Sequence, residues 1–224
     1  MKRYSRTIAA VFSFLFIANV AFSQANKPAF HDDIEAFKKQ DVANPPPQHA
    51  IVFAGSSSFT KWTDVQSYFP DFKIINRGFG GSTLPDLIRY TDDVITNYHP
   101  KQVVIYCGEN DLASSDTVSG ETVVRRFEHL FRLIRAKLPS AQIDFISLKP
   151  SPSREKLFPK MIVANKGIKA FLAKQPHTSF IDVYPLMLDA NGKARTELFV
   201  EDMLHMNKKG YEIWQKEIAP HLLK

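Results

Sequence analysis

Residues 50–58 read AIVFAGSSS, a short apolar run followed by one glycine and three serines. A continuous apolar run of this length is typical of a strand that is covered on both faces of a sheet. The glycine permits a tight turn after the strand, and a serine in that turn can present its hydroxyl group at the start of a helix. The stretch therefore predicts a buried parallel strand that ends in a polar loop.

The same alternation continues along the chain on both sides of this stretch. Apolar runs predict strands at 50–54, 72–75, 102–107, 142–148 and 178–183. Apolar residues at helical spacing predict helices at 83–96, 120–138, 153–173 and 207–222, the last with Asn207 as its N-cap. Strands that alternate with helices favour right-handed crossovers and a parallel sheet. The expected fold class is α/β, a three-layer α/β/α sandwich of the flavodoxin-like kind, with a mainly parallel sheet of about five strands.

The amino-terminal residues indicate export. Three basic residues precede an apolar run at 8–22, and Ala21 and Ser23 supply the small residues of a cleavage site. Since the run is shorter than the roughly 20 residues that span a bilayer, a cleaved signal peptide at 1–23 is favoured over an uncleaved anchor. The predicted organisation is one domain, residues 24–224, in which 24–47 form a short helix and a proline linker. We expect a periplasmic or extracellular protein with no stable membrane association after cleavage.

Charge and cysteine content exclude other classes. The net charge of +6 includes three basic residues of the predicted signal peptide, so the mature chain carries about +3. This is too mild to indicate nucleic-acid binding, and no basic cluster is interleaved with aromatic residues. The single cysteine, Cys107, cannot form an internal disulfide bond and lies in an apolar run, which predicts a buried thiol. The sequence gives no indication of oligomeric state.

Three polar loops follow predicted strands, at 55–58, 76–83 and 108–111. Because the carboxyl ends of parallel strands gather at one edge of a sheet, we expect these loops to meet there. The side-chain amide of Asn110 supplies an N–H donor, and Asp111 is expected to hold its loop by hydrogen bonding. Each loop alone is equally well explained as an ordinary turn or helix cap.

A fourth segment, Asp202-Met203-Leu204-His205, precedes the last predicted helix. A spacing of three residues in a turn lets a carboxylate reach the imidazole ring, fix its tautomer and stabilise its protonated form. None of the other six histidines has an aspartate three residues before it in a strand-to-helix loop. His205 is therefore the best candidate for a general base.

Taken in order, the four segments resemble the four signature blocks of the SGNH hydrolases, also called GDSL-like lipases/acylhydrolases. The resemblance extends over about residues 51–222, and only the combination is specific, since each block alone is common. It implies that Ser57 is the nucleophile, that His205 is the base and that Asp202 orients His205. It further implies an oxyanion hole made by Ser57 N–H, Gly81 N–H and the Asn110 side chain, with no metal or organic cofactor. Ser56 stands where the family usually has aspartate, so the contact made by that aspartate is in doubt.

The expected activity is hydrolysis of a short-chain ester, most plausibly an acetyl group on an extracellular carbohydrate. The alternatives are a lysophospholipase or thioesterase that acts on lipid acyl chains, and a non-catalytic carbohydrate-binding module on the same fold. An α/β-hydrolase is disfavoured because Phe59 occupies the second glycine position of the G-x-S-x-G motif, and a zinc hydrolase because only Asp202 and His205 would converge as ligands. The loop at 149–154 is expected to overhang the site. Lys149 and Arg154 in this loop could contact an anionic or sugar substrate, but solvated loop charges are the favoured interpretation.

Overall fold

The computed structural model describes residues 27–224, so the predicted signal peptide at 1–23 lies outside the described residues. The centre of the molecule is a five-stranded sheet with the order β2-β1-β3-β4-β5, in which every pair of neighbours is parallel. The strands are β1 (Ile51–Gly55), β2 (Ile74–Gly78), β3 (Gln102–Tyr106), β4 (Gln142–Ile146) and β5 (Thr178–Ile181). This is the flavodoxin-like strand order, so the predicted fold class is confirmed.

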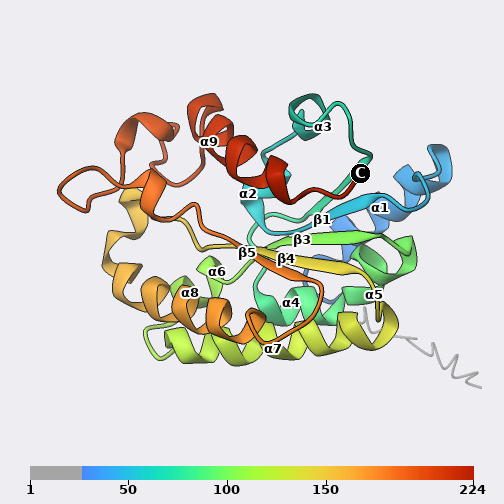
Figure 1. Ribbon diagram of the computed structural model, residues 1–224, viewed down its shortest axis with the longest axis horizontal. Helices are drawn as coiled ribbons and strands as arrows, with labels where there is room; N and C mark the ends of the chain where they lie inside the picture. Colours follow the sequence, from blue (N-terminus) through green and yellow to red (C-terminus); the bar gives the residue numbers. More distant parts are fainter. Residues whose placement is uncertain (1–26) are drawn as a thin grey trace, which may run out of the picture.

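Helices cover both faces of the sheet (Figure 1). One layer holds α4 (Leu84–Arg89), α5 (Thr91–Val94), α7 (Gly120–Lys137) and α8 (Phe158–Leu172). The other holds α2 (Ser57–Thr60), α3 (Val65–Tyr68) and α9 (Lys208–Ile218). The helix α1 (His31–Ala43) is tied to the β2 edge, where Arg77 pairs with Asp41. The carboxyl ends of the strands point to the left in Figure 1, toward α6 (Glu109–Ser114).

Aromatic packing fixes α2 and α9 against the sheet. The rings of Phe59 in α2 and Trp214 in α9 lie 6.1 Å apart, and Trp214 lies 4.8 Å from the ring of Tyr106 in β3. The hydroxyl group of Tyr211 donates a hydrogen bond of 2.9 Å to the carbonyl of Ser58. All of these side chains are buried, and large buried aromatic rings contribute strongly to core stability. The end of β1 and the start of α9 are therefore held together by the core.

The structure corrects several predicted boundaries. The strand predicted at 72–75 runs from Ile74 to Gly78, so Asn76 and Arg77 lie in a strand and not in a loop. The helix predicted at 83–96 is broken into α4, α5 and η1 (Thr96–Tyr98), and that predicted at 153–173 into η2 (Pro152–Leu157) and α8. The last predicted helix ends as η5 (Ala219–His221) after α9, while Asn207 caps α9 as expected.

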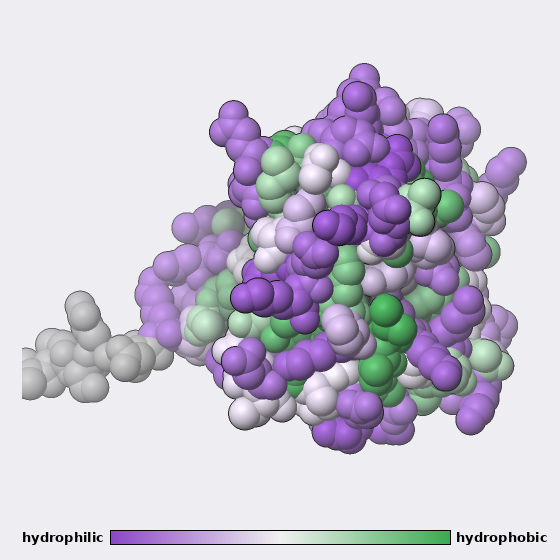
Figure 2. Space-filling model, turned by 90° about the vertical axis from the view of Figure 1, so that its left-hand side faces the viewer, coloured by the Kyte–Doolittle hydropathy of each residue, from purple (hydrophilic) through white to green (hydrophobic). Residues whose placement is uncertain are grey.

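Two further features complete the fold. Cys107 is a free, buried thiol, as predicted. Short 3-10 helices η3 (Pro185–Met187) and η4 (Thr196–Leu198) lie in the long connection between β5 and α9. Within residues 27–224, no helix has the length and apolar character needed to cross a membrane. The side of the molecule at which the strands end is mostly hydrophilic and carries apolar side chains only in small groups (Figure 2).

Candidate active site

The turn after β1 requires a glycine. Gly55 has φ +155°, and a Cβ atom at this position would lie 1.9 Å from the carbonyl oxygen of Tyr106. The same carbonyl accepts a hydrogen bond of 3.1 Å from the N–H of Ser56. No side chain fits between β1 and β3 here, so the chain can turn sharply and begin α2 at Ser57. The side chain of Ser57 is half-buried at the edge of the sheet.

Residues 200–206 form a turn that brings His205 to the same edge. One carboxylate oxygen of Asp202, Oδ1, accepts hydrogen bonds of 2.9 Å from the N–H groups of both Leu204 and His205. Val200 N–H donates to the carbonyl of His205 at 2.9 Å, which closes the turn. Met203 adopts φ +54°, a left-handed conformation that is uncommon for a residue with a side chain. Asp202 therefore orients the backbone of this turn as well as the ring of His205.

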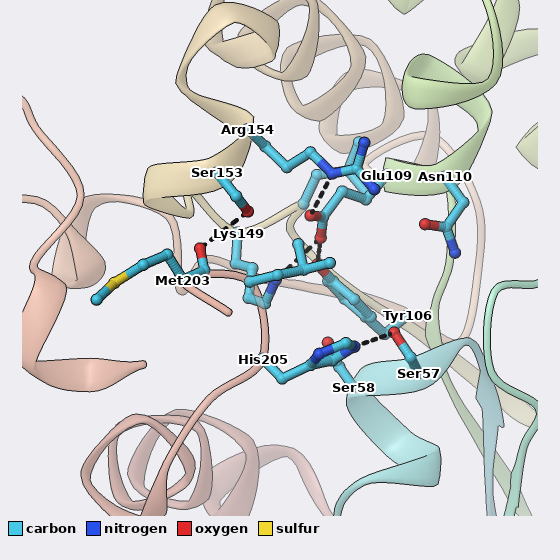
Figure 3. Close-up of polar contacts among 12 residues, drawn as sticks. Ser57, Ser58, Tyr106, Glu109, Asn110, Lys149, Ser153, Arg154, Met203 and His205 are labelled. Carbon is cyan, nitrogen blue, oxygen red and sulfur yellow. Dashed lines mark hydrogen bonds and ion pairs between the residues drawn. The ribbon is translucent and has the colours of Figure 1, made fainter. Parts of the chain in front are cut away.

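The structure joins three of the predicted site residues in one hydrogen-bonded series. The remaining oxygen of Asp202, Oδ2, lies 2.6 Å from His205 Nδ1. His205 Nε2 lies 2.9 Å from Ser57 Oγ (Figure 3). An ionised carboxylate can only accept hydrogen bonds, so Nδ1 carries the hydrogen and Nε2 offers its lone pair to the Ser57 hydroxyl group. Their catalytic roles stay a prediction at this point.

The environment of Asp202 keeps it ionised. Burial raises the pKa of Asp202, but hydrogen bonds from the His205 ring and from the N–H groups of His205 and Leu204 outweigh it and lower the pKa to about 2. The carboxylate is about half exposed, so solvent weakens the charge interaction with the ring. Asp202 is therefore negatively charged at every pH at which the folded protein would be assayed.

Of the other two predicted site residues, Gly81 lies on the loop after β2, and Asn110, predicted in a loop, lies in the first turn of α6. A Cβ atom built on Gly80 would lie 3.9 Å from Ser57 Cβ, which places this loop against the serine. Gly81 has φ +84° and open space in front of its Cα atom. Asn110 Nδ2 donates a hydrogen bond of 3.0 Å to the carbonyl of Ser82. An amide nitrogen has two hydrogens, and the bond to Ser82 uses one of them.

Asn110 stands between two anchored carboxylates in the first turn of α6. Asp111 is buried and accepts hydrogen bonds from Leu84 N–H at 2.9 Å and from Arg126 at 2.7 Å. Burial raises the pKa of Asp111, although these two donors oppose the shift. The prediction that Asp111 holds its loop is confirmed. Its bond to Leu84 ties α6 to the loop that carries Gly81.

The other carboxylate, Glu109, belongs to a buried ion pair that sequence reasoning missed. Glu109 Oε2 accepts hydrogen bonds from the Tyr106 hydroxyl group at 2.6 Å and from Lys149 Nζ at 3.0 Å (Figure 3). Lys149 is only 1% exposed, so its prediction as a solvated loop charge was wrong. Burial, with the neighbouring Glu109 carboxylate, raises the pKa of Tyr106, which keeps its hydroxyl group a donor. A sequence signal did exist, because Lys149 directly follows an apolar strand run.

The chain is similar to known proteins in both sequence and fold. The model of the GDSL-like Lipase/Acylhydrolase family matches residues 45–213. A GDSL-like lipase from Bacteroides thetaiotaomicron superposes with a TM-score of 0.72 at 22% identity, over 84% of this chain and 96% of the lipase. A carbohydrate esterase family 3 structure from Talaromyces cellulolyticus gives a TM-score of 0.62 at 15% identity, over 76% of this chain and 94% of that chain.

An acetyl esterase, solved as its S10A mutant with an acetate ion, gives a TM-score of 0.58 at 15% identity, over 76% of this chain and 94% of that chain. At such identities these structures establish the fold alone. A search of curated proteins gives no significant match. The family model covers most of the chain, including all four predicted signature blocks. The chain therefore belongs to the GDSL-like lipase/acylhydrolase family and is a carboxylic ester hydrolase.

Proposed function

We propose that this protein is an exported serine esterase that removes short acyl groups, chiefly acetyl, from an extracellular carbohydrate through an acyl-Ser57 intermediate. The observation that carries the proposal is the series from Asp202 through His205 to Ser57, with contacts of 2.6 and 2.9 Å. A serine hydroxyl group is a poor nucleophile until a neighbouring base takes its proton, and Nε2 of His205 faces it with a lone pair.

The residues of the site suit a two-step reaction. Ser57 Oγ attacks the carbonyl carbon of the ester while His205 Nε2 takes the hydroxyl proton, and the carbonyl oxygen becomes an oxyanion. The N–H groups of Ser57 and Gly81 and the second amide hydrogen of Asn110 stabilise this oxyanion. His205 then gives its proton to the departing alcohol. Water, deprotonated by His205, attacks the acyl group, and the proton returns to Ser57 as the acid leaves.

Several features support a short acyl group on an exported glycan. The amino-terminal sequence has the pattern of a signal peptide, and the side of the molecule that carries the site is mostly hydrophilic (Figure 2). Two of the solved structures that share this fold are described as an acetyl esterase and as a carbohydrate esterase. No long apolar insertion is evident in the mature sequence that would cover a lipid tail.

One observation favours the second candidate, an esterase or thioesterase of lipid acyl chains. Val200 and Met203, which flank Asp202 in the His205 turn, are 41% and 38% exposed. Exposed apolar side chains beside a catalytic site can contact the acyl chain of a substrate. Their small area distinguishes this site from a broad lipid-binding surface.

Hydrolysis of p-nitrophenyl esters from acetyl to palmitoyl tests the choice between these functions. We expect kcat/KM to be highest for acetyl or propionyl and to fall beyond butyryl, because the side of the molecule that carries the site is mostly hydrophilic (Figure 2). All esters should be measured below their solubility limits, with release of p-nitrophenol as the signal. A maximum at octanoyl or longer would overturn the short-chain proposal in favour of the lipid acyl candidate.

Asp202→Asn tests the role of the acid. The amide would donate to Nδ1 and place the ring hydrogen on Nε2, where it opposes deprotonation of Ser57, so we expect kcat to fall by about 10⁴-fold. Steady-state hydrolysis of p-nitrophenyl acetate measures the loss, and an Asp202→Asn enzyme within tenfold of wild type would contradict this assignment.

A further inference from the structure

The backbone of Arg154 lies next to the turn formed by residues 200–206, which carries His205. The preceding residue, Ser153, donates two hydrogen bonds to the carbonyl oxygen of Met203, one from its N–H at 3.0 Å and one from its hydroxyl group at 2.9 Å. Arg154 N–H donates to Ser151 at 2.9 Å, and its own non-helical backbone, with φ −117°, interrupts η2. The backbone from which the Arg154 side chain extends is therefore fixed relative to the proposed general base.

The side chain of Arg154 reaches to the opposite side of the site. Its Nε atom lies 4.0 Å from Oε1 of Glu109, the residue that immediately precedes Asn110. Figure 3 shows the guanidinium group beside Glu109, on the side of the view that also holds Asn110, with Ser57 and His205 facing them from below. Arg154 thus extends from η2, beside the turn that carries the base, to the helix that carries the proposed oxyanion donor.

The charge of Arg154 is not neutralised by its neighbours. The other oxygen of Glu109, Oε2, already accepts hydrogen bonds from Lys149 at 3.0 Å and from Tyr106 at 2.6 Å. The carboxylate of Glu109 thus lies between two cations, and the shorter contact is the one with buried Lys149. At 4.0 Å the outer contact exceeds hydrogen-bond length, and within residues 27–224 the guanidinium group donates no hydrogen bond. The cluster of Lys149, Glu109 and Arg154 therefore has a net charge of +1.

We propose that Arg154 binds an anionic group, a carboxylate or a phosphate, on the alcohol portion of the ester. The inference rests on the proposed esterase function and narrows its substrates to acidic esters. A guanidinium group presents paired N–H donors that match the two oxygens of a carboxylate or phosphate. Arg154 is 28% exposed, so a substrate can reach it without opening the core. Acidic sugars carry the carboxylate, and lysophospholipids carry the phosphate.

The test compares two acetyl esters of matched shape, 4-acetoxybenzoate and the uncharged 4-acetoxybenzamide. We expect the wild-type enzyme to prefer the benzoate in kcat/KM, mainly through a lower KM. Arg154→Gln should reduce the ratio of kcat/KM for benzoate over benzamide by about tenfold, and Arg154→Lys, which keeps the charge, should retain part of the preference. The ratio cancels any loss of folded enzyme.

Lys156→Gln is the matched control, since Lys156 is an exposed cation of the same η2 segment and its loss changes the net charge equally. This variant should keep the wild-type ratio. Equal kcat/KM for the two esters in the wild type, or an unchanged ratio in Arg154→Gln, would exclude a carboxylate as the anion. The same result with a phosphate ester and its uncharged counterpart as well would overturn the proposal. An equal fall of the ratio in Lys156→Gln would reduce the effect to general surface charge and would overturn it too.

Binding to the Ser57→Ala protein separates this inference from the esterase function. We expect 4-acetoxybenzoate to bind this variant more tightly than 4-acetoxybenzamide by calorimetry, and the additional change Arg154→Gln to remove the difference. That result supports the anion site even if the wild type hydrolyses neither ester. Lysophosphatidylcholine and a monoacylglycerol of equal chain length form the second arm, and an Arg154-dependent preference in that pair alone identifies phosphate as the anion.

Discussion

Replacement of Ser57 by alanine is expected to lower kcat for p-nitrophenyl acetate by about 10⁶-fold. Without the hydroxyl group no acyl-enzyme forms, and His205 loses the group that it deprotonates at 2.9 Å. The remaining rate comes from the oxyanion donors acting on a direct attack by water. Steady-state hydrolysis, with enzyme concentrations high enough to detect the residual rate, measures the loss.

Ser56→Ala is the control for this prediction. Ser56 lies in the same turn and is buried, but its side chain forms no hydrogen bond within residues 27–224. We expect this variant to stay within about tenfold of wild type, because deletion of a hydroxyl group away from the reacting atoms removes no catalytic contact. A fluorophosphonate should add one covalent label to the wild type and none to Ser57→Ala. A wild-type protein that is not labelled would favour the carbohydrate-binding module.

Lys149→Met is expected to give the largest loss of stability, about 3–5 kcal/mol in the free energy of unfolding. The substitution leaves the carboxylate of Glu109 buried without its cation, and Glu109 Oε1 already lacks a hydrogen-bond partner. Urea denaturation, followed by the fluorescence of the buried Trp62 and Trp214, measures the change.

A second change on the Lys149→Met background distinguishes ion pairing from packing. Lys149→Met with Glu109→Gln should recover much of the lost stability, because the uncharged amide keeps an acceptor for Tyr106 and no charge remains buried. Lys38→Met, which removes an exposed cation that pairs with Glu35 and Asp93, should leave the urea midpoint nearly unchanged. If the double variant is no more stable than Lys149→Met, the loss comes from packing of the lysine stem.

The positions of most strands along the chain were predictable because buried parallel strands are nearly continuous apolar runs. The exception is β2, where Asn76 and Arg77 resemble loop residues but lie in a strand. Asn76 Nδ2 donates to the carbonyl of Phe59 at 2.8 Å, and Arg77 reaches Asp41 and Tyr98, which are distant in the sequence. Hydrogen-bond partners outside the segment make polar residues acceptable in this strand, and no local pattern encodes them.

The broken helices have local causes that periodicity does not reveal. Thr91 Oγ1 lies 2.9 Å from the carbonyl oxygens of both Leu87 and Ile88 and donates a hydrogen bond to them. This contact lies where α4 ends and α5 begins. The second break lies in η2, where Arg154 has non-helical backbone angles, and α8 begins only at Phe158, with Pro159 in its first turn. Apolar residues keep helical spacing across both breaks, so a pattern based on spacing alone joins the segments.

The candidate site was more predictable than its support. Ser57, Asp202 and His205 carry residue types and spacing that indicate their chemistry in the sequence itself. Lys149 has only its place after an apolar run as a signal, because its partner Glu109 is 40 residues away and only the folded chain shows that the two meet. Pairs that satisfy each other across the fold are the part of a site that a single sequence hides.

The His205 turn is joined to the rest of the protein by few bonds, among them the two from Ser153, and it holds Met203 in a strained conformation. On heating, the enzyme can therefore lose activity before it unfolds, since this peripheral turn can open while the aromatic core stays intact. A heat-tolerant version of the enzyme would come from relieving the strain in residues 200–206, for instance with asparagine at position 203, which tolerates a positive φ. Further filling of an already dense interior would do less to prolong turnover.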